Sequence, residues 1–342
     1  MPYELPADRR TDRRTAIGRW ATFAIVAILV ALLAYLGYVG FVGSAQAVDP
    51  ARSRDCRTPA HLGWQYEAIG YDIASDDRLT DLPDPIDCDA APVMAGSSLV
   101  TADGVSLAGW YIPAGSGNPD APTIVLAHGH GVNKSAVLTR AELLHPDYHL
   151  LLFDFRAHGQ SEESASTVGL RERLDLGRVI DWLEAEKAPS AIGVLAVSMG
   201  GAAALMEARS DPRVDALVVE STHATLANAI QARLDRQGYP LSLPGAWAIL
   251  LGGLLRSGED MSAADPIQAI EDYGERPILL VAGGRDDTLG ANDAEDQLAA
   301  ARAGGADAAL RVCEEAGHAA SLEACPDDYA DWVLGFFADA LG

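Results

Sequence analysis

Ser198 is the first candidate catalytic residue in this 342-residue chain, and it directly follows an apolar run. Residues 191–197 are typical of a buried strand, and the small residues after Ser198 begin a helix. Such a sharp strand-to-helix turn, a nucleophile elbow, usually has the pattern Gly-x-Ser-x-Gly, because it leaves no room for side chains two residues either side of the serine. Ala196 and Gly200 occupy those two positions here. The alternative is a tight turn whose serine only caps the helix.

Ser198 needs two partners, because a serine hydroxyl is a weak nucleophile until a base takes its proton and an acid orients that base. His318 is the candidate base, since it is the only histidine after His223 and directly precedes the last expected helix. Asp286, in the loop after an expected strand, is the candidate acid and is favoured over the adjacent Asp287. The order serine, aspartate, histidine is typical of one architecture.

An acyl-transfer site also needs backbone N–H groups that point at the developing oxyanion. We expect one from Met199, the residue after the serine, and one from His130 in the glycine-containing loop that follows an earlier strand. His128 and His130 could instead bind a metal, but two histidines without a nearby acidic ligand are weak support for that reading. We therefore predict neither a metal nor a cofactor.

The elements that must position these residues alternate between strands and helices from about residue 96 to residue 342. Such alternation predicts an α/β fold whose mostly parallel sheet has helices on both faces and is entered through an antiparallel hairpin at Asp103-Gly104. Ligands of such sheets bind at the carboxyl ends of the strands. The expected strands are residues 98–102, 105–111, 123–127, 148–153, 192–197, 216–219, 277–282 and 309–313, and the expected helices outside the elbow are residues 132–144, 168–186, 291–303 and 321–338.

Residues 222–265 interrupt this alternation, because they are first helical in pattern and then strongly apolar. An insertion after the sixth strand lies over the carboxyl ends of the strands, so we expect a helical lid above Ser198. The alternative is an extra pair of packed helices that never touch the substrate.

The amino terminus carries several arginines and then an uncharged apolar stretch, residues 21–43, that is long enough to cross a bilayer. This pattern predicts a cytoplasmic segment (residues 1–20), a transmembrane anchor and an extracytoplasmic catalytic domain. Ala45-Gln46-Ala47 resembles a cleavage site, so secretion after removal of a signal peptide is the alternative. Residues 44–95, rich in Asp, Pro and Ser, are expected to form an irregular extracytoplasmic spacer or cap.

The cysteines and the net charge limit the cellular compartment and the binding partners that we expect. Four cysteines fit an exported domain, and pairing of near neighbours gives Cys56–Cys88 and Cys313–Cys325, with four buried thiols as the alternative. The formal net charge of −24 would repel nucleic-acid phosphates and anionic lipid surfaces from the bulk of the protein, so we expect no nucleic-acid partner. The oligomeric state stays open.

With these motifs the chain resembles serine hydrolases of the α/β-hydrolase superfamily, from about residue 97 to its end apart from the insertion. The resemblance rests on the elbow, the loop at residues 128–131, Gly317-His318 and the family pattern Asp-x-Arg-Gly-x-Gly-x-Ser that begins at Asp154. Ala157 replaces the first glycine of that pattern, and Asp154 and Arg156 are expected to hold the loop.

The resemblance implies a serine hydrolase that cleaves carboxylic esters through an acyl-enzyme. A single amino-terminal span joined to such a domain is similar to membrane-anchored members that act on lipid-like or acyl esters. A serine peptidase or a thioesterase with the same triad is the first alternative. From another class, a catalytically silent surface binding protein is the second.

Overall fold

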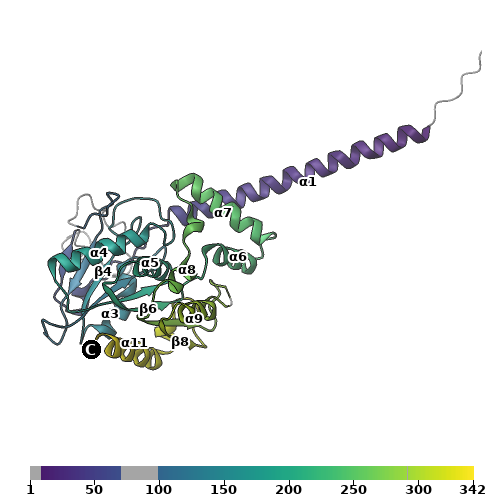
Figure 1. Cartoon of the computed structure of the whole chain (residues 1–342). Helices are drawn as coiled ribbons and strands as arrows, with labels where there is room; N and C mark the ends of the chain where they lie inside the picture. The colour runs from purple at the N-terminus through teal and green to yellow at the C-terminus, as the bar shows by residue number, and fades with distance from the viewer. Residues whose placement is uncertain (1–8, 71–98, 291) are drawn as a thin grey trace, which may run out of the picture.

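The computed structural model describes residues 9–70, 99–290 and 292–342, with the side chains of the first helix described from Arg19 onward. A long amino-terminal helix, α1 (Arg9–Val48), projects from an α/β domain (Figure 1). Residues 19–48 of this helix are apolar and long enough to be a candidate membrane span.

An eight-stranded sheet forms the centre of the domain, in the order β1-β2-β4-β3-β5-β6-β7-β8. The first two strands run antiparallel to their neighbours, and the other six are parallel, as the alternation predicts. The strands are β1 (Glu67–Ile69), β2 (Gly109–Ile112), β3 (Thr123–Ala127), β4 (His149–Phe153), β5 (Ile192–Val197), β6 (Val214–Glu220), β7 (Pro277–Gly283) and β8 (Asp307–Cys313).

Helices cover both faces of the sheet because successive side chains of a strand point to opposite faces. In β3, Val125 packs in the core beneath α4 and α5, whereas Leu126 packs in the core beneath α3 and α11. Burial on both faces explains why the central strands are apolar throughout. The helices after α1 are α3 (Leu138–Leu144), α4 (Glu172–Glu186), α5 (Met199–Ala208), α6 (Leu226–Arg236), α7 (Ser242–Ser257), α8 (Pro266–Glu271), α9 (Asp293–Ala303), α10 (Ser321–Ala324) and α11 (Pro326–Leu341).

The predicted hairpin at Asp103-Gly104 is shorter than expected. Its turn is present, with Gly104 at a φ of 89°, but only one antiparallel bridge, between Val100 and Ser106, follows from it in the described residues. The Ser106 and Ala108 amides point away from residues 99–101: the Ala108 N–H donates to the Ser161 hydroxyl, and the Ser106 N–H donates to the Glu162 carboxylate. Of the two expected hairpin strands, only the end of the second, β2, therefore belongs to the sheet.

The expectation of irregular structure for residues 44–95 is wrong at three places. Residues 44–48 continue α1, Pro59–Leu62 form a short 3-10 helix, and Glu67–Ile69 form β1, which pairs with the edge of β2. A three-residue edge strand needs only backbone hydrogen bonds, so it leaves no alternating pattern in the sequence. Residues 71–98 lie outside the described residues.

The cysteine predictions have different outcomes. Cys313 and Cys325 form a disulfide, which joins the end of β8 to the start of α11. The predicted Cys56–Cys88 pair includes a residue outside the described ranges and stays a prediction.

The 222–265 insertion contains α6 and α7, and α1 crosses α7 at small residues. A Cβ at Gly40 would lie 2.6 Å from the Ala248 carbonyl oxygen, and one at Gly252 would lie 2.6 Å from the Ser44 hydroxyl, so only glycine permits this approach. Arg256 adds hydrogen bonds from α7 to Ser44 Oγ and to a carbonyl of α1. We call α6, α7 and the adjoining end of α1 the roof.

Candidate active site

Ser198 lies between the last residue of β5 and the first residue of α5, and its backbone is strained. Its φ of 55° and ψ of −117° lie outside the regions that non-glycine residues prefer. The surrounding fold holds this conformation, since the Ser198 N–H donates to the Glu220 carbonyl oxygen of β6 at 2.8 Å. The elbow predicted from the sequence is therefore formed, with the serine side chain partly exposed at the carboxyl end of the strand.

Small residues are needed around this turn. A Cβ at Gly200 would lie 2.6 Å from the His128 carbonyl oxygen, and one at Gly201 would collide with the side chain of Thr222. The Thr222 hydroxyl in turn donates to the Ser198 carbonyl oxygen at 3.0 Å. Ala196 is fully buried at the position where the usual pattern has glycine, and its methyl group is accommodated in the core beneath α4 and α5.

The structure brings Ser198, His318 and Asp286 together. His318 Nε2 lies 2.9 Å from Ser198 Oγ, and His318 Nδ1 lies 2.8 Å from Asp286 Oδ2. A carboxylate only accepts, so Nδ1 carries the proton of the neutral ring and Nε2 is left to accept from the serine hydroxyl. Asp287 is exposed, and no hydrogen bond joins it to the ring.

Two glycines allow the loops after β7 and β8 to meet. A Cβ at Gly283 would lie 2.5 Å from the carbonyl oxygens of Ala316 and Gly317, and the Gly284 N–H donates to the Cys313 carbonyl oxygen at 2.8 Å. These contacts place the residues that follow, Asp286 and His318, on the same side of the sheet edge.

Asp286 is held as a carboxylate. Burial acts to raise its pKa, but the hydrogen bond to His318, the charge of that ring, and the amides of Thr288 and Leu289 together lower the pKa below its ordinary value. Those two amides donate to Asp286 Oδ1 at 2.8 and 3.3 Å, leaving Oδ2 for the imidazole. An ionised carboxylate at this position fixes the tautomer and the orientation of the ring.

A buried ion pair lies directly behind the histidine loop. Arg140 of α3 donates to both carboxylate oxygens of Glu220 at 2.8 and 2.9 Å, and it also donates to the Ala319 carbonyl oxygen at 2.8 Å. The Tyr329 hydroxyl donates to the same carboxylate at 2.9 Å. This network was not predicted from the sequence. The signal was a glutamate at the end of an apolar strand, because a buried charge requires a partner.

The loop after β3 passes beside the serine. A Cβ at Gly129 would lie 3.3 Å from Ser198 Cβ, so this loop contacts the nucleophile directly. The two histidine rings of the loop contact backbone groups: His128 Nδ1 lies 2.7 Å from the Gly129 carbonyl oxygen, and its Nε2 accepts from the Phe155 N–H. His130 Nε2 donates to the Ala47 carbonyl oxygen of α1 at 2.9 Å. The amides of His130 and Met199 therefore belong to segments that flank Ser198.

Asp154 and Arg156 hold the neighbouring loop, as expected from the sequence. Asp154 accepts from the Lys134 ammonium and amide, and Arg156 pairs with Asp175 and Asp103. Ala157 has a φ of 63°, which explains why the family pattern has glycine there.

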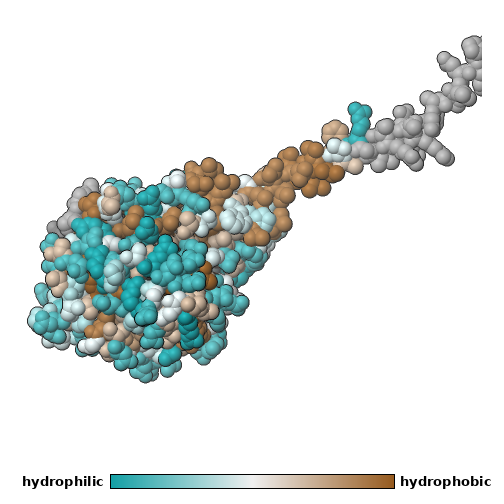
Figure 2. Space-filling model, viewed as in Figure 1, coloured by the Kyte–Doolittle hydropathy of each residue, from teal (hydrophilic) through white to brown (hydrophobic). Residues whose placement is uncertain are grey.

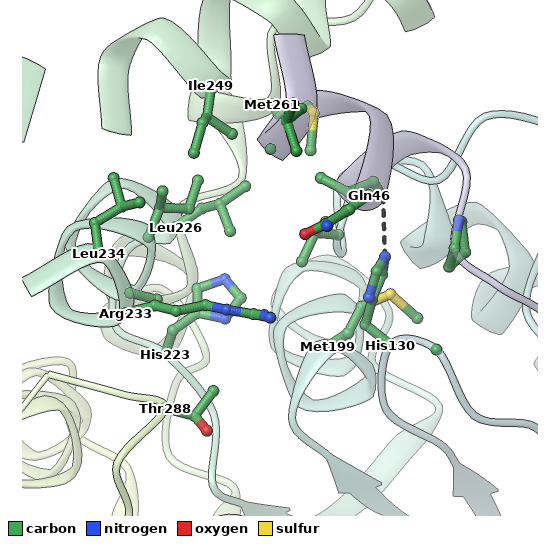
Figure 3. Close-up of a pocket in the computed structure, with 18 of the residues that line it drawn as sticks. Gln46, His130, Met199, His223, Leu226, Arg233, Leu234, Ile249, Met261 and Thr288 are labelled. Carbon is green, nitrogen blue, oxygen red and sulfur yellow. Dashed lines mark hydrogen bonds between the residues drawn. The ribbon is translucent and has the colours of Figure 1, made fainter. Parts of the chain in front are cut away.

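A cavity of about 1020 Å³ lies over Ser198 (Figure 3). Its walls come from the loop at His130, from the start of α5, and from all three helices of the roof. The 222–265 insertion is therefore placed over the serine. Lining residues include Val39, Val42, Gln46, Ala47, His130, Met199, His223, Leu226, Ile230, Arg233, Leu234, Ile249 and Met261.

The outer side of the roof is apolar. Trp247, Leu251 and Leu255 of α7 are 53%, 58% and 79% exposed, which is unusual for large apolar side chains. Figure 2 shows this patch continuing onto the exposed apolar side chains of α1.

A sheet of this strand order, with a strained serine after its fifth strand and a histidine hydrogen-bonded to that serine, defines the class of α/β hydrolases. Residues 124–332 match the Alpha/beta hydrolase family, and the chain belongs to that family.

Relatives with a curated sequence cover about two thirds of the chain. The chain is 29% identical over 222 residues to the uncharacterised protein Rv2307c of Mycobacterium tuberculosis. The matched region spans 64% of this chain and 71% of the relative. It is 27% identical over 228 residues to the uncharacterised protein YfhR of Salmonella typhi, with 62% and 71% covered.

Solved structures share the fold. The Pyrococcus furiosus esterase Pf2001 superposes with a TM-score of 0.66 at 22% identity, over 86% of this chain and 99% of the esterase. A hydrolase from Pseudomonas aeruginosa superposes with a TM-score of 0.53 at 23% identity, over 70% and 96% of the two chains.

Proposed function

We propose that the protein is a membrane-anchored serine hydrolase that cleaves carboxylic esters, with Ser198 as nucleophile, His318 as base and Asp286 as the acid that orients it. The observation that carries this proposal is the pair of hydrogen bonds at His318, 2.9 Å to Ser198 Oγ and 2.8 Å to Asp286 Oδ2. Such a chain of three groups removes the serine proton as the hydroxyl attacks.

The reaction follows from this geometry in two halves. Ser198 Oγ attacks the ester carbonyl carbon while His318 Nε2 takes its proton, and the amides of His130 and Met199 bind the oxyanion. Collapse of this intermediate expels the alcohol, which receives the proton from His318. Water, deprotonated by the same nitrogen, then attacks the acyl-enzyme, and the carboxylic acid leaves as Ser198 regains its proton.

An ester substrate is favoured by the lining of the cavity. Side chains of the roof make its walls mainly apolar, which suits the acyl part of an ester. The fold similarity to an esterase is compatible with this reaction. We assign residues 222–265 the role of a lid.

We place the catalytic domain outside the cytoplasm, with residues 1–20 inside and α1 as an uncleaved anchor. The candidate span supports the anchor, and the basic residues before it support the direction. Cleavage at Ala45-Gln46-Ala47 would remove the part of α1 that lines the cavity and the residue that accepts the hydrogen bond from His130. A chain of 36.0 kDa in the membrane fraction is expected, and a shorter soluble chain that begins near Val48 would contradict the anchor.

Hydrolysis of p-nitrophenyl esters of increasing acyl length tests the reaction. We expect turnover by the full chain in detergent and a loss of about 10³- to 10⁴-fold or more in kcat for Ser198→Ala. Ser210→Ala, the same substitution beyond the far end of α5 at an exposed site, is the matched control and keeps full activity. A folded Ser198→Ala variant with wild-type turnover contradicts the proposal.

A further inference from the structure

Arg233 is a solvent-exposed, positively charged side chain in the wall of the catalytic cavity. Among the described residues that line this cavity, it is the only lysine or arginine. Its side chain extends from α6 toward the side of the cavity where Met199 and His130 lie (Figure 3). No carboxylate within the described parts of the chain forms an ion pair with it, in contrast to Arg140 and Arg156, which are paired.

Arg233 and His130 both line the cavity. The pKa of His130 is lowered chiefly by burial, and the charge of Arg233 contributes in the same direction. The only carboxylate in the described lining is Asp49, which is exposed and interacts with Arg52. An anionic ligand in the cavity could therefore pair with one cation, Arg233, in the same wall as His130.

Much of the rest of the wall is apolar and is shaped by helices of the roof. α1 contributes Val39 and Val42, α6 contributes Leu226 and Ile230, and α7 contributes Ile249. A cavity of about 1020 Å³ is at the upper end of the range for small-molecule sites. Such a wall fits a long acyl chain.

The helix that forms this wall is also the candidate membrane span. Residues 19–48 form the span, and the part of it from Tyr38 to Ala47 lines the cavity. The exposed apolar side of α7 continues the apolar surface of α1 (Figure 2). An amphiphile in the bilayer would reach the cavity along these two helices.

We propose that the substrate is a membrane glycerolipid that carries a phosphate: its acyl chain lies along α1, α6 and α7, its ester carbonyl lies at Ser198, and its phosphate pairs with Arg233. A guanidinium binds phosphate oxygens through two parallel hydrogen bonds. The net charge of −24 opposes an anionic substrate at long range. Charges more than about 8 Å away are screened at physiological ionic strength, so the nearby guanidinium decides the binding. This inference rests on the proposed ester hydrolysis.

The test compares two lipids with the same ester bond and the same acyl chain, 1-oleoylglycerol and 1-oleoylglycerol 3-phosphate, in detergent micelles with the full chain. We expect the wild type to prefer the phosphate by about 10- to 100-fold in kcat/KM. Arg233→Gln is expected to lose this preference through KM and to retain the rate on the neutral lipid. Arg209→Gln makes the same charge change on the exposed far side of α5 and is expected to keep the preference.

A second variant tests whether the acyl chain lies along the cavity wall formed by α1, α6 and α7. Ala229 is half-buried in the wall on α6, and Ala229→Trp fills space that the chain would occupy. We expect this variant to lose activity on oleoyl lipids while it retains activity on butyryl esters. Equal loss on both chain lengths contradicts the placement of the chain.

Labelling of Ser198 by a fluorophosphonate separates the possible failures. If the wild type is labelled but hydrolyses the neutral lipid at least as well as the phosphate, or if Arg233→Gln keeps the preference, the lipid inference is wrong and the serine hydrolase stands. If a folded wild type is not labelled and cleaves neither lipid, the proposed function is also wrong.

Discussion

The sheet edge beneath Ser198 and the roof above it are built in different ways. Below, the charged groups have fixed partners: Asp286 accepts from three donors, and Glu220 binds Arg140 and Tyr329. Above, the contacts are mainly apolar, and several large side chains of α7 are exposed.

The two regions differ in how precisely their atoms must be placed. Bond-making requires atoms within hydrogen-bond distance, so the groups around Ser198 are fixed by buried partners. Binding of an apolar chain needs only shape and area, so the roof tolerates a looser construction. Substitutions in the two regions should therefore differ in size and in kind.

The largest effect is expected at the base. His318→Gln removes the nitrogen that accepts the serine proton, and we expect a loss of about 10⁴-fold in kcat with the melting temperature nearly unchanged. Steady-state kinetics on a short ester measures it. A variant that keeps a tenth of the wild-type rate contradicts the role of His318.

The next largest effect is a loss of stability when the Arg140–Glu220 ion pair behind the His318 loop is broken. Arg140→Leu leaves the buried Glu220 carboxylate without its charge partner, and we expect a loss of about 3–5 kcal/mol in the free energy of unfolding. The double variant Arg140→Leu/Glu220→Leu removes both charges and should be less destabilised than the single variant. Urea unfolding checks both, and a single variant that costs under about 1 kcal/mol would show that the pair is not coupled.

A pH-dependent effect is expected from His223, at the border of the two regions. Burial, together with the charge of His318, lowers the pKa of His223 to about 4, below its ordinary value of 6.5. The fold therefore favours the neutral ring, so its contribution is complete above pH 6.5 and is lost as the pH falls from 6.5 toward 4. The slope from this one group is about 1.4 kcal/mol per pH unit.

His223→Gln is expected to remove that share of the slope. Unfolding free energies measured between pH 7 and 4.5 for the two proteins give the comparison. Burial also lowers the pKa of His158, to about 2, so the variant retains some acid sensitivity. Identical slopes would show that His223 titrates as it does in the unfolded chain.

The smallest effect on stability is expected in the roof. Trp247→Ser changes an exposed side chain, so the free energy of unfolding should change by no more than about 0.5 kcal/mol. Binding to phosphatidylcholine vesicles should weaken, because an apolar anchor is lost, while turnover of a soluble ester stays the same. A large loss of stability would place Trp247 in the packed core instead.

The parts that the sequence predicts well are those in which one short segment contains the whole signal. The elbow at Ser198, the order of Asp286 and His318, and the alternation of strands and helices all lie in local patterns. The disulfide Cys313–Cys325 was predictable because its cysteines are near neighbours.

The parts that were missed depend on contacts between distant segments. Arg140 and Glu220 are 80 residues apart, and His130 meets Ala47 across 83 residues. Neither pair leaves a local pattern. α1 lines the cavity because it packs on α7, and glycines on both helices permit this packing. Amino-acid composition alone cannot reveal such a contact.

The most direct test of the central claim is fluorophosphonate labelling of the full chain in detergent, followed by peptide mass spectrometry. We expect one modified residue, Ser198, with labelling abolished in Ser198→Ala and strongly slowed in His318→Gln. A folded wild type that resists the probe, or a label on a different serine, would contradict the account.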